Sequence, residues 1–537
     1  MSALAGDSTP APSADRVRWL RRLPGLVTLV VFVALGLCVI ATQNRFVGFE
    51  PGYDERQPRH HGWVSSHALA IISHASASNG FVGYALAYAE PDGTVRYDYF
   101  DRYPVFFSAA MHQVLSATER LSSRVYLAKQ AMNLIFLATL FFAALIVDKL
   151  VRSKPAALAA AVLAVSSEYL LFYKDMVHFD QPALLGMMIL VYTLGLYWID
   201  GHRRLPYLGT ALAVAMGRGY ASFTVLLVWL VTEAVLRLRG SKLGWREGVA
   251  AVVRLPAFRA CVLGFGLGAI LLSYNIGVES WRTGVPPIQT SIFQSAEQRL
   301  GFDPAYNAAY ADVVSWKRFL QDQLDRLIRW SVPLRRPGSE IGPNLVILAG
   351  ALTVIGLQFR RWDRGRRVVA LLLAVPGVVW MILMRNMSAP HDYTSMYYLG
   401  VPLLFYASAL SLLQVARRPV IGWGLMAGAL LLFFTANRNT QTLHRRLERG
   451  SDVNVSLSQY TWDMMEIRKA LPSDGATVAL TRAFPNAPYG FGFYLPEHLI
   501  GSIDDAEFVI STDADPLAEN LTPDNRRLFL FSRLSEQ

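Results

Sequence analysis

The stretch Gly52-Tyr-Asp-Glu-Arg-Gln-Pro-Arg-His-His61 follows closely on the first long apolar run of the chain, which extends from Leu23 to Ala41. An apolar run of that length is sufficient to span a lipid bilayer as a helix. Asp54 and Glu55 are therefore predicted to lie at a membrane surface, shortly after the chain leaves the bilayer. A carboxylate at that position is either solvated and idle or takes part in chemistry at the surface.

The composition is that of an integral membrane protein. Of the 537 residues, 53% are hydrophobic and 17% are charged, a combination that is rare in soluble domains. The net charge of +11 comes from Lys and Arg in short loops between apolar runs, which is typical of cytoplasmic loops rather than of a nucleic-acid-binding surface. Cys38 and Cys261 both fall within apolar runs, so they are interpreted as buried thiols and not as a disulfide.

Apolar runs predict an α-helical polytopic membrane protein with about eleven transmembrane helices. A cytoplasmic tail of residues 1–22 precedes this transmembrane domain, which covers residues 23–436. Basic residues gather in alternate loops, so the N-terminus is predicted to be cytoplasmic and the C-terminus extracytoplasmic. The predicted spans are 23–43, 126–148, 155–173, 182–199, 205–217, 219–236, 258–275, 343–359, 367–384, 396–415 and 419–436.

Two long loops, 44–124 and 276–342, are then extracytoplasmic. In the first loop, the spacing of residues 61–74 predicts an amphipathic helix at the membrane interface, and Pro91-Asp-Gly93 predicts the turn of a hairpin. In the second, residues 311–330 are predicted to form a helix that lies on the membrane. Residues 437–537 are predicted to form a small extracytoplasmic α/β domain with strands at 476–480, 508–511 and 527–531.

The outer side carries a concentrated set of ionisable residues, which are costly near hydrocarbon and therefore mark function. A carboxylate can deprotonate an acceptor hydroxyl, and an arginine can bind a phosphate group through two hydrogen bonds. The candidates are Asp54, Glu55, Arg102, Asp175, His178, Asp180, Arg218 and His391.

Three of these candidates also have an interpretation without a role in catalysis or binding. Asp180 could cap the following helix, with Pro182 in its first turn. Arg102 could anchor the chain at lipid headgroups, and Arg218 could bind carbonyl groups at the end of a span. For a metal ion, His178 and Asp180 together with Asp54 are the best candidates, because the repeat of histidines at positions 60, 67 and 74 spaces neighbours about 10.5 Å apart along a helix, too far for one ion.

Four short motifs of the chain, in their order along the sequence, resemble motifs of the polyprenyl-phosphate-sugar-dependent membrane glycosyltransferases of the type-C fold. The nearest resemblance is to the protein O-mannosyltransferases and the lipid A aminoarabinose transferases. The Asp54-Glu55 pair resembles the acidic pair in the first outer loop of that family. Asp101-Arg-Tyr-Pro-Val-Phe106 resembles its basic-Pro-Pro-aromatic motif, Phe179-Asp-Gln-Pro182 its Asp-x-Pro motif, and Gly217-Arg-Gly219 its Lys-Gly element. The chain departs from the family where Val105 replaces a proline and where arginine replaces lysine at positions 102 and 218.

The resemblance implies a bacterial inner-membrane enzyme that transfers a sugar from a polyprenyl monophosphate to a glycan, lipid or protein acceptor. It implies that Asp54 is the general base, with Glu55 and Asp180 as further catalytic residues, and that Arg102 and Arg218 bind the donor phosphate. Asp175 and His391 would support the site. Whether the enzyme uses a divalent cation is left open. The alternative functions are a lipid-linked-sugar flippase without catalysis and a polymerase or ligase of surface polysaccharide.

Overall fold

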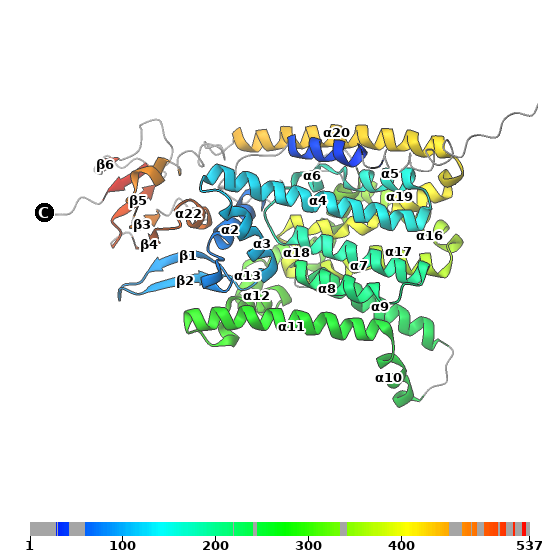
Figure 1. The fold of residues 1–537 in the computed structure, drawn as a ribbon, viewed down its shortest axis with the longest axis horizontal. Helices are drawn as coiled ribbons and strands as arrows, with labels where there is room; N and C mark the ends of the chain where they lie inside the picture. The colour runs from blue at the N-terminus through cyan, green and yellow to red at the C-terminus, as the bar shows by residue number, and fades with distance from the viewer. Residues whose placement is uncertain are drawn as a thin grey trace, which may run out of the picture.

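The computed structural model describes residues 28, 30–41, 60–217, 220–239, 244–332, 341–449, 464, 466–473, 475–480, 488–502, 505–511, 519–520 and 529–532. Within these ranges the chain forms a long helical bundle with a mixed sheet at one end (Figure 1). We call that end of the bundle the sheet end. Asp54, Glu55 and Arg218 lie outside the described residues.

Eight helical segments of the described residues are long and apolar enough to cross a membrane. The remaining three predicted spans coincide with shorter apolar helices, so the total of eleven stays a prediction. The eight are α4 (Leu121–Val151), α7 (Asp180–Asp200), α9 (Tyr220–Leu238), α11 (Pro256–Thr283), α16 (Ile341–Arg361), α17 (Arg364–Leu383), η3 (Asp392–Leu399) continued by α19 (Gly400–Leu412), and α20 (Pro419–Arg449). The shorter ones are the helix at Val30–Ala41, α5 (Lys154–Val165) and α8 (Leu205–Gly217).

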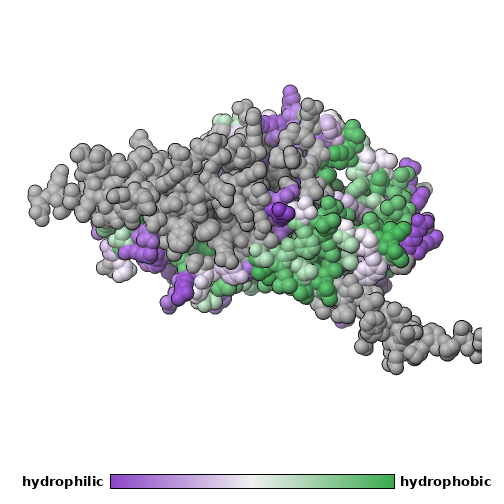
Figure 2. Space-filling view, turned by 90° about the horizontal axis from the view of Figure 1, so that it is seen from above, coloured by the Kyte–Doolittle hydropathy of each residue, from purple (hydrophilic) through white to green (hydrophobic). Residues whose placement is uncertain are grey.

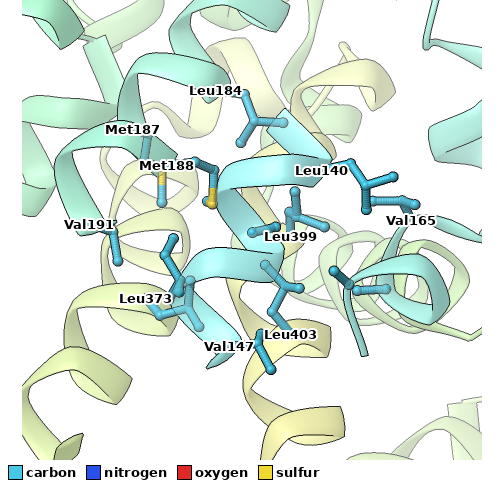
Figure 3. Packing of buried hydrophobic residues seen from close by; sticks show 14 of the residues in the cluster. Leu140, Val147, Val165, Leu184, Met187, Met188, Val191, Leu373, Leu399 and Leu403 are labelled. Atoms are coloured by element: carbon cyan, nitrogen blue, oxygen red, sulfur yellow. The ribbon is translucent and has the colours of Figure 1, made fainter. Parts of the chain in front are cut away.

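Helix α7 is the centre of the bundle and packs against α4, α8, α9 and α17. Small residues let α7 and α8 approach closely, because a Cβ on Gly186 would lie 2.9 Å from the Cα atom of Ala213. Figure 3 shows the core around Met188 and Leu403, where aliphatic and methionine side chains interdigitate. Seen from above, hydrophobic side chains gather over the middle of the visible face and hydrophilic ones toward its two ends (Figure 2).

Basic residues gather at the end of the bundle opposite the sheet, here called the basic end. Lys149 bonds Asp200 at 2.6 Å and so joins the ends of α4 and α7. Arg364 donates to the carbonyl of Leu236 at 3.3 Å and joins the start of α17 to the end of α9. Because α7 has 21 residues, its other end at Asp180 lies about 30 Å away. Further arginines at the basic end are Arg152, Arg237, Arg360, Arg361 and Arg367.

At the sheet end, the first long loop folds into α2 (His60–Ser73), η1 (Ala77–Asn79), β1 (Tyr84–Ala89), β2 (Val95–Tyr99) and α3 (Val105–Ser116). The predicted helix and hairpin are therefore confirmed. The interfacial position of the helix is wrong, because the side chains from Val64 to Ile72 are all buried. Helix α2 packs against α3, β1 and α22 (Pro488–Tyr494) from the C-terminal region, so protein rather than lipid covers it.

The small α/β region at the C-terminal end is confirmed, and its sheet includes two strands from the first long loop. The seven strands follow the order β2-β1-β4-β3-β5-β7-β6. Strand β1 pairs in parallel with β4, with Tyr88 opposite Ile500. The C-terminal strands are β3 (Thr477–Leu480), β4 (Leu499–Ile500), β5 (Phe508–Ser511), β6 (Glu519–Asn520) and β7 (Phe529–Ser532). Helix α20 reaches Arg449, beyond the predicted domain boundary at 436.

The second long loop folds into η2 (Pro287–Gln289), α12 (Ser291–Leu300), α13 (Pro304–Ala309), α14 (Ala311–Val314) and α15 (Trp316–Ser331). Helix α15 packs against η3 and α16, with Phe319 and Ile328 buried. Arg326 donates to the carbonyls of Ser388 and Ala389 in and after α18 (Arg385–Ser388). This loop is therefore attached to the segment that leads into η3. The remaining elements are α6 (Glu168–Phe172), α10 (Trp245–Val253) and η4 (Val415–Arg417).

Candidate functional site at the sheet end of the bundle

Asp180 is the first residue of α7 and is 1% exposed. Its two carboxylate oxygens have separate partners: Nδ1 of His178 lies 2.5 Å from one, and the hydroxyl of Tyr397 donates to the other at 2.7 Å. The interpretation of Asp180 as a helix cap is wrong, because Phe179 occupies the cap position. The first turn of a helix nevertheless favours a negative charge.

Aromatic rings surround this acidic pair. Tyr103 lies edge-on to His178 and Phe179, at centroid distances of 5.3 and 5.1 Å, and Tyr393 lies edge-on to His178 at 5.6 Å. Burial, followed by the nearby Tyr393 and Asp180, raises the pKa of Tyr103 well above its ordinary value. The Tyr103 phenol is therefore neutral.

Arg102 lies beside this group on the segment between β2 and α3. Its Nη1 donates to Oγ of Ser295 in α12 at 2.9 Å, and its guanidinium lies 3.6 Å above the ring of Phe100. The Phe100 ring in turn contacts Tyr103 at 5.2 Å. The predicted Arg102 and Asp180 are thus brought to one end of the bundle, connected through Tyr103.

Arg299, near the C-terminal end of α12, is a site residue that sequence reasoning missed. Its guanidinium interacts electrostatically with Asp180, Tyr103 and Tyr393. Helix α12 is held against the site because Ser291 donates to Asp101 at 2.6 Å and Asn386 donates to the carbonyl of Gln298 at 3.1 Å. No motif marks Arg299, since it is one arginine in a long polar loop.

The two predicted supporting residues have different surroundings. Asp175 is completely buried and lies 3.8 Å from the equally buried Lys129 of α4. Such a pair is costly to break, because removal of one partner leaves a buried charge uncompensated. His391 Nδ1 contacts the carbonyl of Met387 at 2.8 Å, and its ring packs edge-on against Tyr393 at 5.5 Å. His391 therefore joins the aromatic group around Asp180, whereas Asp175 pairs with α4.

The predicted metal ligands His178 and Asp180 are bound to each other. In the part of the chain that the structure describes, no three His, Cys, Asp or Glu side chains come together as a metal site. Asp54, the third proposed ligand, lies outside the described residues.

The structure of the chain superposes on ArnT from Cupriavidus metallidurans bound to undecaprenyl phosphate with a TM-score of 0.54 and 11% sequence identity, over 95% of this chain and 98% of that one. The same protein in the apo state gives a TM-score of 0.53 and 12% identity over the same shares of both chains.

The chain has the type-C membrane glycosyltransferase fold. An archaeal oligosaccharyltransferase from Archaeoglobus fulgidus, tethered to an acceptor peptide, is also similar, with a TM-score of 0.47 and 13% identity over 89% of this chain and 64% of that one. No family model and no curated protein sequence matches the chain. The type-C fold predicted from the motifs is therefore confirmed, and at these identities the likeness concerns the fold alone.

Proposed function

We propose that the protein transfers a sugar from a polyprenyl monophosphate to a hydroxyl group of a glycan, lipid or protein acceptor on the extracytoplasmic side of the membrane. The observation that carries this proposal is the buried Asp180 with two arginines, Arg102 and Arg299, at the end of the bundle opposite the basic loops. Basic loops favour the cytoplasm. The type-C fold supports the proposal further, because ArnT of that fold was crystallised with undecaprenyl phosphate.

In the proposed reaction, the acceptor oxygen attacks the anomeric carbon of the sugar while the bond between that carbon and the phosphate oxygen breaks. The electron pair of the broken bond stays on the phosphate, so the products are the glycosylated acceptor and the polyprenyl monophosphate. The acceptor proton passes to Asp54 as general base. A single displacement of this kind inverts the anomeric configuration.

The departing phosphate gains negative charge, and arginine is the side chain best suited to stabilise it. Arg102, on the segment before α3, and Arg299, on α12, both interact electrostatically with Tyr103, so we assign the donor phosphate to this pair. Arg218, proposed for the same role, lies outside the described residues and stays a proposal. Asp180, held at both oxygens, would orient the sugar or the acceptor through its negative charge. Glu55 is proposed to support Asp54.

A flippase would need polar groups along a path through the membrane. Among the described residues, buried acids of the long helices instead lie near helix ends: Asp180 and Glu279 at the sheet end of α7 and α11, and Glu233 at the basic end of α9. Since these acids avoid the middle of the membrane, their arrangement favours catalysis over transport.

The test is to incubate the purified protein with a panel of undecaprenyl-phosphate sugars and candidate acceptors and to detect undecaprenyl phosphate and glycosylated product by mass spectrometry. Asp54→Asn is expected to abolish turnover while expression and thermal stability stay intact. Substantial turnover by that variant would overturn the assignment of the base, and release of no carrier from any donor in the panel would overturn the proposed reaction.

A further inference from the structure

Asn275 is a buried amide near the sheet end of α11, within an otherwise largely apolar part of that helix. It is 1% exposed. Its Nδ2 donates two hydrogen bonds, one to the carbonyl of Asp101 at 2.8 Å and one to the carbonyl of Tyr103 at 2.7 Å. A single amide group thus uses both of its N–H bonds on the two carbonyls that flank Arg102.

The consequence for Arg102 is geometric. The carbonyls on either side of it are attached to one nitrogen on a transmembrane helix, so the backbone at Arg102 cannot rotate without breaking at least one bond. Its side chain is then directed by the Phe100 ring on one side and the Ser295 hydroxyl on the other. Asn275 thus fixes the backbone at Arg102, and Phe100 and Ser295 fix its guanidinium group.

Two neighbouring contacts reinforce this frame. The Ser291 hydroxyl donates to the carboxylate of Asp101, which is completely buried, and Glu279 accepts a hydrogen bond from the backbone amide of Ser291 at 2.9 Å. Glu279 lies one helical turn beyond Asn275 on α11. The helix that bears Asn275 therefore also holds the start of α12, on which Arg299 lies.

We propose that Asn275 is a positioning residue that sets the direction of the Arg102 guanidinium toward the donor phosphate. The inference rests on the proposed function only for the identity of that ligand. The positioning itself follows from the two hydrogen bonds. Polar side chains that are buried in membrane helices generally serve function rather than stability, and this one has an identified target.

The experiment compares Asn275→Leu, which fills nearly the same space without any N–H, with Asn344→Leu as a matched control. Asn344 is also a buried amide, 1% exposed, but it bonds Asp325 of α15 at 3.4 Å. Asn275→Ser, which keeps one shorter donor, serves as an intermediate variant in case the leucine variant does not fold. The probe is undecaprenyl phosphate without a sugar, with binding measured by native mass spectrometry.

The expected result is an increase of about tenfold in Kd for undecaprenyl phosphate in Asn275→Leu, a smaller increase in Asn275→Ser and no change in Asn344→Leu. If Asn275 acts through Arg102, the leucine change adds nothing in an Arg102→Ala background. Additive losses in the double variant, or wild-type affinity in Asn275→Leu, would overturn the inference.

Hydrogen–deuterium exchange separates this inference from the proposed function. Peptides that cover residues 99–106 are expected to exchange faster in Asn275→Leu than in the wild type or in Asn344→Leu. Unchanged exchange would refute the positioning role whatever the ligand. Wild-type protein that binds no undecaprenyl phosphate would count against the proposed function, and the exchange result would then decide the inference alone.

Discussion

Tyr397 donates a hydrogen bond of 2.7 Å to Asp180 although 217 positions separate the two residues in the chain. The bond joins η3 to the start of α7. The other carboxylate oxygen is occupied by His178, so the carboxylate cannot rotate without losing a charge-assisted contact. Its orientation is therefore fixed before any substrate arrives, which is what a carboxylate that orients a sugar or an acceptor requires.

Replacement of Tyr397 by phenylalanine tests this pre-organisation. Loss of one hydrogen bond to a buried carboxylate is expected to lower kcat by about tenfold, and Asp180→Asn is expected to lower it further. The measurement is the rate of sugar transfer under donor saturation. The control is Tyr398→Phe, because the Tyr398 hydroxyl donates to Gln323 instead, at 2.9 Å. Equal losses in the two phenylalanine variants would show that the Asp180 contact has no special role.

The role of Arg299 is tested by its effect on the donor. Arg299→Ala is expected to raise KM for the polyprenyl donor by about tenfold or more, because a charged hydrogen bond to phosphate is lost. Arg299→Lys should retain part of the affinity. Arg318→Ala on α15, whose guanidinium lies 3.7 Å from Asp322, is the control. A change in acceptor KM without a change in donor KM would assign Arg299 to the acceptor instead.

Much of the bundle could be predicted from hydropathy, since each predicted span coincides with an apolar helix of the structure. Helix α2 shows why periodicity alone was insufficient. The helical spacing of Trp63, His67, Ala70, Ile71 and His74 suggested an amphipathic helix at the membrane interface. His67, Ala70 and Ile71 are instead buried, because α22 and β1 cover the helix. Burial of a helix by segments that are distant in the sequence leaves no pattern in the sequence of the helix itself.

The residues of the candidate site also fall into those that could be predicted from the sequence and those that could not. Arg102 and Asp180 lie in short motifs whose residue types could be matched by sequence. Tyr397, Arg299 and Asn275 come from three other segments, and each is an isolated polar residue without a motif. Their partners become visible only when η3, α12 and α11 are placed in space, because hydrogen bonds such as that from Asn275 to Tyr103 span 172 positions.

Gly377 of α17 allows η3 to lie directly against that helix. A Cβ at this position would clash with the carbonyl oxygen of Tyr397. Gly377→Ala is therefore expected to displace Tyr397, to destabilise the protein by about 1–3 kcal/mol and to reduce transfer as Tyr397→Phe does. Gly350→Ala on α16, which precedes α17 in the chain, is the control, because nothing lies within 4 Å of a Cβ there. Thermal unfolding and transfer rate are the measurements, and identical behaviour of both alanine variants would contradict the prediction.

His67 of α2 predicts how stability depends on pH. Burial, followed by the charges of Arg102 and His178, lowers the pKa of His67 well below its ordinary value of 6.5. As the pH falls below 6.5, the unfolded chain binds a proton that the folded protein does not, so the free energy of unfolding decreases. The melting temperature is therefore expected to fall between pH 7 and pH 5, and His67→Phe, which suits the neighbouring Phe100 ring, should reduce that fall. His74, whose pKa burial also lowers, would account for part of the remainder. Replacement of the exposed His202 by phenylalanine is the control. If the melting temperature of His67→Phe depends on pH as that of the wild type does, His67 does not remain neutral in the folded protein.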